Sequence, residues 1–119
     1  MKSTREKGKI AEDIACEYLL RKGCEIVARN FYTRFGEIDI VCKEDDQLVF
    51  CEVKAKFHEY QGLPEEEFHQ EKYERFQSAI FSYLLSHSIN DDTYRIDLLA
   101  MQLDERKKEC TVRHYRNYY

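Results

Sequence analysis

The sequence has little that would interrupt regular structure and nothing long enough to cross a membrane. It contains one proline in 119 residues. No stretch approaches the roughly 20 consecutive apolar residues that a membrane-spanning helix needs. The polar start MKSTREKGK lacks the apolar segment of a signal peptide. We therefore expect a cytoplasmic protein with no membrane partner and with well-solvated helices and strands.

Metal sites built from sulfur or imidazole also have little support. The five cysteines form no CxxC pair, and the four histidines form neither a helical i, i+4 pair nor a His-x-His. Cys42 and Cys51 alternate with apolar residues, so we expect both in the core. The sequence predicts neither a disulfide framework nor a thiolate zinc site.

A basic surplus is absent as well. The 19 lysines and arginines are outnumbered by 23 aspartates and glutamates, which gives a net charge of −4. Proteins that coat nucleic acid through their overall field usually carry a basic footprint, so any nucleic-acid contact here must be local. The candidate cations are Lys2, Arg5, Lys7, Lys9, Arg29, Arg34, Lys54, Lys56 and Lys72. Each of them could equally be an ordinary solvated side chain.

The length and the hydrophobic fraction of 43% suit one compact domain over residues 1–119. Apolar residues at three- and four-residue spacing predict one helix over 4–22, which Gly23 ends, and a second from Pro64 to about residue 88. Alternating and β-branched segments predict strands at 24–31, 36–42, 47–57, 94–103 and 110–115. The order αβββαββ indicates an α/β fold with a mixed sheet, in which an antiparallel meander is followed by a helical crossover.

The strongest functional signal is the geometry of the predicted central hairpin. If Asp45 and Asp46 form a two-residue loop, residues pair across the strands when their numbers sum to 91, which sets Asp39 opposite Glu52. Lys54 then shares the face of Glu52, because side chains alternate along a strand. The opposite face would be the apolar one, formed by Ile38, Ile40, Cys42, Val49, Cys51 and Val53.

Two carboxylates placed opposite each other destabilise a sheet unless something neutralises them. A divalent cation such as Mg²⁺ would do so and would bring a hydrolytic water beside the lysine. Two alternatives remain open. Lys54 could form a salt bridge with both acids on a solvated face, or a longer turn could shift the register and separate Asp39 from Glu52.

Two further charged residues lie at the margins of the helical stripes. Glu12 flanks the apolar stripe of the first helix and could reach the sheet, and Lys72 lies one turn before Phe76 on the inward stripe of the second helix. Both side chains could instead extend along the surface to water.

Several segments carry a resemblance to a known family. They are GKIAEDIACEYLLRKG, ARNFYTRFGEIDIVCKEDDQLVFCEVKAK, Pro64 with Lys72, and RIDLLA. Over nearly its whole length the chain resembles the YraN family of largely uncharacterised small bacterial proteins. That family is similar to the restriction-endonuclease-like superfamily with its PD-(D/E)XK motif, and within it to archaeal Holliday-junction resolvases.

The resemblance implies a restriction-endonuclease-like mixed sheet flanked by helices. It also implies that Asp39 and Glu52 bind Mg²⁺ or Mn²⁺, that Lys54 orients or activates the attacking water, and that Glu12 assists. The reaction would be hydrolysis of phosphodiester bonds in DNA, branched or otherwise structured, with Lys56, Lys72 and Arg34 as candidate nucleic-acid contacts. A homodimer is compatible with this activity. The alternatives are a nucleic-acid-binding module with little or no catalysis, and a protein-interaction partner that retains the fold.

Overall fold

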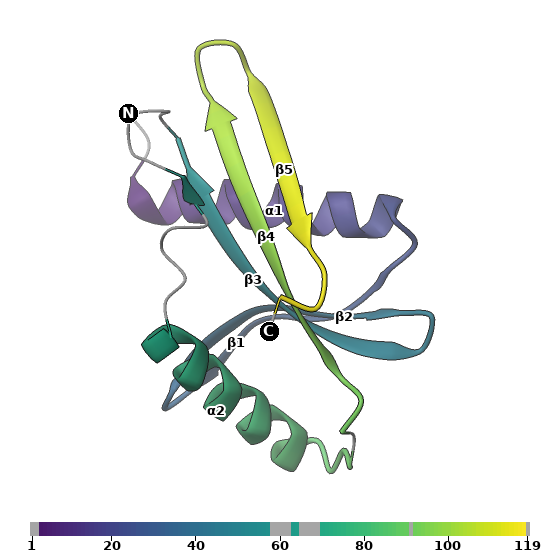
Figure 1. Ribbon diagram of the computed structural model, residues 1–119. Coiled ribbons are helices and arrows are strands. Elements are labelled where there is room, and N and C mark those ends of the chain that lie inside the picture. Colours follow the sequence, from purple (N-terminus) through teal and green to yellow (C-terminus); the bar gives the residue numbers. More distant parts are fainter. Residues whose placement is uncertain (1–2, 58–62, 65–69, 91, 119) are drawn as a thin grey trace.

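Seven helices and strands make up the described part of the chain, in the predicted order αβββαββ. The computed structural model describes residues 3–57, 63–64, 70–90 and 92–118. The elements are α1 (Thr4–Arg21), β1 (Glu25–Thr33), β2 (Gly36–Glu44), β3 (Gln47–Lys56), α2 (Gln70–Ser86), β4 (Arg95–Asp104) and β5 (Glu109–Tyr115) (Figure 1). Among the described residues, no helix is long and apolar enough to cross a membrane.

The ends of α1 follow from local chemistry. Ser3 and Glu6 form a reciprocal capping box, which satisfies two backbone N–H groups at the start of the helix. At the other end Gly23 adopts a φ of +91°, and the N–H of Cys24 returns to the carbonyl of Leu19. The predicted role of Gly23 as the end of this helix is therefore confirmed.

The sheet has the strand order β1-β2-β3-β4-β5. Neighbouring strands are antiparallel except β3 and β4, which run parallel because α2 carries the chain back across the sheet. In the turn between β2 and β3, Asp45 and Asp46 have φ values of 50° and 68°, as a two-residue type I′ hairpin loop requires. The pairs Val41↔Phe50 and Ile40↔Cys51 confirm the predicted register. The backbone pairing ends there, one residue short of Asp39.

Both faces of the sheet are covered, so the expectation of one apolar face and one polar face is wrong. α1 packs on one face and α2 on the other, because the crossover that makes β4 parallel also places a helix over the second face. The α1-side core comprises Ala11, Ala15, Cys16, Leu19, Cys24, Ile40, Cys42, Val49, Cys51, Leu99, Met101 and Leu103. The α2-side core comprises Ile38, Val41, Leu48, Phe50, Phe76, Ala79, Ile80, Tyr83, Leu84 and Ile96.

Ile38 and Ile40 belong to different cores although they lie two residues apart on β2. Regular alternation would place them on the same face, so the alternation breaks at Asp39. On the neighbouring strand, the pairs on either side of Asp39 place Asn30 opposite it, and Asn30 has a left-handed φ of 51°. The prediction that Ile38 shares a face with Ile40 is therefore wrong, and the irregularity lies where the candidate site begins.

The second helix has the predicted inward stripe. Phe76, Ala79, Ile80, Tyr83 and Leu84 are all buried. The helix was predicted to begin at Pro64; the structure describes it from Gln70, and residues 65–69 lie outside the described residues.

A second polar cluster lies away from this region and joins β4, β5 and α1. Asp97 is fully buried and accepts hydrogen bonds from Arg95 Nε at 2.8 Å and from the Asn117 N–H at 3.0 Å. Its other oxygen lies 2.7 Å from His114 Nε2, and His114 Nδ1 lies 3.0 Å from the Tyr18 hydroxyl. Burial alone would raise the pKa of Asp97. The hydrogen bonds have the larger effect, so the pKa of Asp97 lies below its ordinary value.

Candidate metal centre

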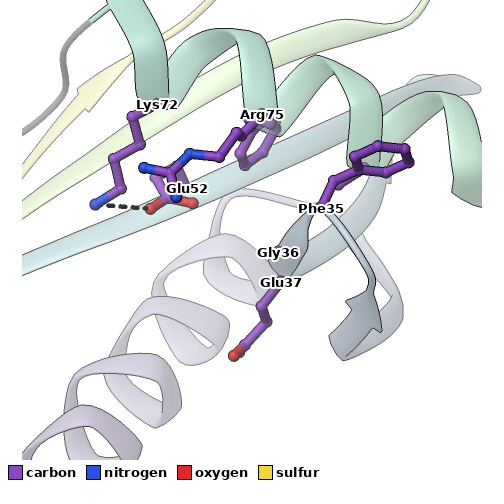
Figure 2. Close-up of a pocket in the computed structure, with 8 residues that line it drawn as sticks. Phe35, Gly36, Glu37, Glu52, Lys72 and Arg75 are labelled. Carbon is purple, nitrogen blue, oxygen red and sulfur yellow. Dashed lines mark ion pairs between the residues drawn. The ribbon is translucent and has the colours of Figure 1, made fainter.

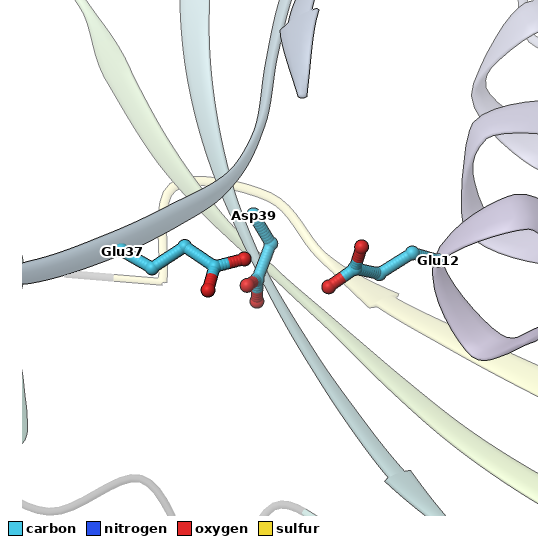
Figure 3. Close-up of side chains that lie close together, drawn as sticks. All are labelled: Glu12, Glu37 and Asp39. Carbon is cyan, nitrogen blue, oxygen red and sulfur yellow. The ribbon is translucent and has the colours of Figure 1, made fainter. Parts of the chain in front are cut away.

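Three carboxylates converge at the start of β2. Glu12 reaches over from α1, while Glu37 and Asp39 come from β2 (Figure 3). One oxygen from each of the three lies within 4.8 Å of the other two. The structure thus brings the predicted residues Glu12 and Asp39 together and adds Glu37, which the sequence interpretation did not include.

Asn30 holds two of these carboxylates in place. Its side-chain nitrogen donates to Glu12 Oε1 at 2.7 Å and to Glu37 Oε1 at 2.6 Å. The left-handed backbone conformation of Asn30 is one that asparagine tolerates better than most residues. One amide therefore bridges α1 and β2 and offsets part of the repulsion between the two acids.

Asp39, like the other two carboxylates, is partly buried. Burial raises its pKa well above the ordinary value, and the nearby charge of Glu52 raises it further. A hydrogen bond from the Val53 N–H, at 2.8 Å, acts in the opposite direction. Burial likewise raises the pKa of Glu12. The raised pKa values mean that Glu12 and Asp39 resist carrying a negative charge, and a nearby divalent cation would remove this resistance.

Glu52 lies beside this group but is held by lysines. It is 6% exposed, and its Oε1 lies 3.2 Å from Lys54 Nζ. The same oxygen lies 3.9 Å from Lys72 Nζ, the ion pair drawn in Figure 2. The salt bridge left open by the sequence is thus formed with Glu52. Burial alone would lower the pKa of Lys54. The negative charge of Glu52 and the hydrogen bonds of the ammonium group outweigh burial, so the pKa of Lys54 lies above its ordinary value. Lys72 comes from α2, and Lys54 from β3, the strand of Glu52 itself.

Arg29, another predicted cation, lies beside the carboxylates, with Nη2 4.0 Å from Glu12 Oε1 and 2.8 Å from Asp13 Oδ1. Lys56 is half-buried at the end of β3, and Arg34 is exposed in the turn between β1 and β2. The guanidinium carbon of Arg34 lies 4.8 Å from the centre of the Phe35 ring, a cation–π distance. Arg75 on α2 lies near Lys72 and Glu52 (Figure 2). The sequence interpretation missed Arg75. Its position three residues after Lys72 could have indicated it.

The donor set suits a hard divalent cation. Mg²⁺ favours carboxylate oxygens and keeps several waters, and oxygens bound at its usual distance lie about 3 to 4 Å apart. Glu12, Glu37 and Asp39 would need only a small closure to reach that spacing. The donors are carboxylates with an amide beside them, so they match Mg²⁺ or Mn²⁺ better than a metal that prefers sulfur or imidazole.

The fold and the carboxylate group together define an α/β protein with a candidate metal centre between α1 and β2, an inner strand of a five-stranded mixed sheet. A protein-family model described as uncharacterised protein family UPF0102 matches residues 11–101, and the chain belongs to this family. The resemblance to a YraN-like family of uncharacterised bacterial proteins is thereby confirmed. The matched range includes the three carboxylates, Glu52 and both lysines, but not β5.

Relatives with the same family name span nearly the full chain. A UPF0102 protein from Syntrophomonas wolfei is 36% identical over 105 residues, which cover 88% of this chain and 91% of the relative. One from Pelotomaculum thermopropionicum is 33% identical over 94% of this chain and 93% of its own length. One from Campylobacter lari is 41% identical over 81% of this chain and 83% of its own length.

Proposed function

We propose that this protein is a metal-dependent endonuclease that hydrolyses phosphodiester bonds in DNA. The observation that carries the proposal is the convergence of Glu12, Glu37 and Asp39 beside a buried Glu52–Lys54 pair. The order of GEID and EVK on neighbouring strands, and their resemblance to the PD-(D/E)XK motif, support the same reaction. Branched or otherwise structured DNA is the proposed substrate, and a homodimer the proposed assembly.

The proposal gives each side chain a role. Glu12, Glu37 and Asp39 hold Mg²⁺ or Mn²⁺, which would supply a polarised water and neutralise charge on the phosphate. Lys54 orients the water and stabilises the negative charge that develops on the phosphate oxygens. Glu52 positions Lys54 through the ion pair between Oε1 and Nζ, which lie 3.2 Å apart. Its negative charge also raises the pKa of Asp39.

The direct test is cleavage of junction, flap and single-stranded DNA by purified protein with Mg²⁺ or Mn²⁺. Asp39→Asn should abolish cleavage. Asp46→Asn is the matched control: it makes the same chemical change in the exposed hairpin loop, where the left-handed φ suits asparagine. Equal cleavage by wild type and Asp39→Asn would show contamination and reject the proposal. Salt-dependent DNA binding without cleavage would instead identify a binding module.

A further inference from the structure

A cavity of about 130 Å³ opens beside the candidate metal centre, between α2 and the turn that joins β1 to β2. Glu37 and Glu52 form part of its wall, and Lys72 and Arg75 on α2 form another part (Figure 2). Phe35 reaches from the turn toward α2 and contributes an aromatic wall. The cavity thus combines acidic, basic and aromatic surfaces within reach of one ligand.

The charges around the cavity are divided by side. Glu37 lies with the carboxylates that would hold a metal, whereas Lys72 and Arg75 stand three residues apart on one face of α2. An anionic strand entering here would be repelled by the acids and attracted by the helix. A phosphate would therefore lie against Lys72 and Arg75, and the neighbouring phosphate would face the metal.

Phe35 is a partly exposed aromatic side chain with charged residues beside it. It is 37% exposed, and Arg34 lies over its ring. It also lines a second hollow along α2, which includes Phe81. Exposed aromatic rings beside basic residues are the usual platform on which proteins stack bases of single-stranded nucleic acid.

We propose that this cavity binds one unpaired base, stacked on Phe35, with its phosphate held by Lys72 and Arg75. An apolar cavity of about 150 Å³ holds one benzene molecule, so the space fits a single six-membered ring and not a base pair. The strand must then be unpaired beside the cleaved bond, as in a single strand, a flap or the branch of a junction. The inference rests on the proposed function for taking the ligand to be nucleic acid.

Binding without metal tests the inference separately from cleavage. We would titrate a short dye-labelled single strand, and the blunt duplex of the same sequence, in EDTA at low salt and measure fluorescence anisotropy. Phe35→Leu keeps apolar bulk but removes the ring, and we expect it to weaken single-strand binding about 5- to 30-fold while leaving duplex binding unchanged. Phe35→Tyr should restore binding, because it restores the aromatic ring, and a strand of pyrimidines should bind at least as well as a strand of purines.

Tyr115→Leu is the matched control, because Tyr115 has the same exposure of 37% but lies on β5. It should bind single strands like wild type. Arg75→Gln should weaken binding. It should also reduce the slope of the logarithm of the binding constant against the logarithm of the salt concentration by about one, because one phosphate contact is lost. Thermal unfolding followed by circular dichroism would verify that each variant is folded.

Equal single-strand affinity of wild type and Phe35→Leu, or equal losses for single strand and duplex, would overturn the inference. A loss in Tyr115→Leu alone would place the stacking surface on β5 and would overturn it too. Ring-dependent single-strand binding in a protein that neither binds metal nor cleaves DNA would reject the nuclease proposal alone. Metal-dependent cleavage with ring-independent binding would reject only the base pocket.

Discussion

The carboxylate of Asp39 accepts a hydrogen bond from the backbone N–H of Val53, at 2.8 Å. This contact joins β2 to β3 beyond the last backbone pair, Ile40↔Cys51. Asp39 is therefore a link between strands as well as a candidate metal ligand, and its two roles respond differently to substitution.

Asp39→Asn and Asp39→Ala should separate these roles. Asparagine keeps an oxygen that can accept from Val53, so we expect Asp39→Asn to fold as stably as wild type but to lose metal binding. Alanine leaves the Val53 N–H without its partner, at a cost of about 1–3 kcal/mol. Urea unfolding and calorimetric titration with Mn²⁺ measure the two effects. Equal metal affinity in wild type and Asp39→Asn would contradict the assignment.

Asn30 should be required for stability in the absence of metal. Asn30→Ala removes the amide that bridges Glu12 and Glu37 and places alanine at a φ of 51°, so we expect a loss of about 1–3 kcal/mol. Asn30→Gly tolerates the backbone and isolates the loss of the amide. Urea unfolding with and without Mg²⁺ tests whether repulsion between the carboxylates causes the loss. If it does, Mg²⁺ should restore part of the lost free energy of unfolding in both variants. Identical losses with and without metal would argue against repulsion between the carboxylates as the cause.

Glu37 and Glu52 should differ in their effect on metal affinity. Glu37 belongs to the converging carboxylates, whereas Glu52 is engaged by Lys54. We expect Glu37→Gln to weaken Mn²⁺ binding by about tenfold or more and Glu52→Gln to weaken it less, because affinity follows the number of charged ligands. Calorimetric titration of both variants decides this. A larger loss for Glu52→Gln would support the prediction that Glu52 binds the metal together with Asp39.

Lys54→Met should separate catalysis from metal binding. Methionine keeps the apolar stem without the charge, and Lys72 still pairs with Glu52 at 3.9 Å. We expect cleavage to slow by about 100-fold or more, as for loss of a group that stabilises charge in the transition state, while Mn²⁺ affinity persists. Single-turnover cleavage at saturating metal measures the rate. Unchanged cleavage would remove Lys54 from the proposed machinery.

The buried Asp97 cluster should make the fold sensitive to acid. The pKa of Asp97 is lower in the folded protein than in the unfolded chain, where it is about 3.9. The ionised carboxylate therefore stabilises the fold above that pH, and this stabilisation is lost as the pH falls through the pKa of the folded state. Asp97→Asn leaves Arg95 and His114 without the carboxylate, and we expect it to cost about 3–5 kcal/mol at neutral pH. Urea unfolding across the acidic range should show this gap narrowing as the pH falls.

His114→Gln is a milder variant of the same cluster, because its amide can still donate to Asp97. We expect a smaller loss at neutral pH and a pH profile that keeps the shape of wild type. A gap between wild type and Asp97→Asn that stays constant down to low pH would contradict the assigned origin of the acid sensitivity.

Much of the fold follows from local patterns in the sequence. The helical stripes and alternating strands fix the element order, and a two-residue loop at Asp45 and Asp46 fixes the register of the hairpin. Both signals act between residues close in the chain, so they can be predicted without knowledge of the tertiary structure. The helical periodicity of α1 indicated that Glu12 could reach the sheet, and the family resemblance assigned it to the same site as Asp39.

The parts that could not be predicted depend on tertiary contacts. The break of alternation at Asp39 accompanies the left-handed Asn30, whose side chain contacts α1 and β2. No short-range pattern specifies that conformation. The second covered face arises because α2 packs across the sheet. Glu37 is different, since it precedes Asp39 by two residues and strand alternation could have indicated it.

The parallel pairing of β3 with β4 has a consequence for the order of folding. The two hairpins of β1, β2 and β3 are local and can form within microseconds, whereas β4 pairs only after the connection through α2 has closed. Glu37 and Asp39 are thus brought together early, before α2 delivers Lys72 to Glu52. We expect refolding to accelerate when Mg²⁺ is present from the start, since the cation would relieve the repulsion between Glu37 and Asp39 in these early hairpins.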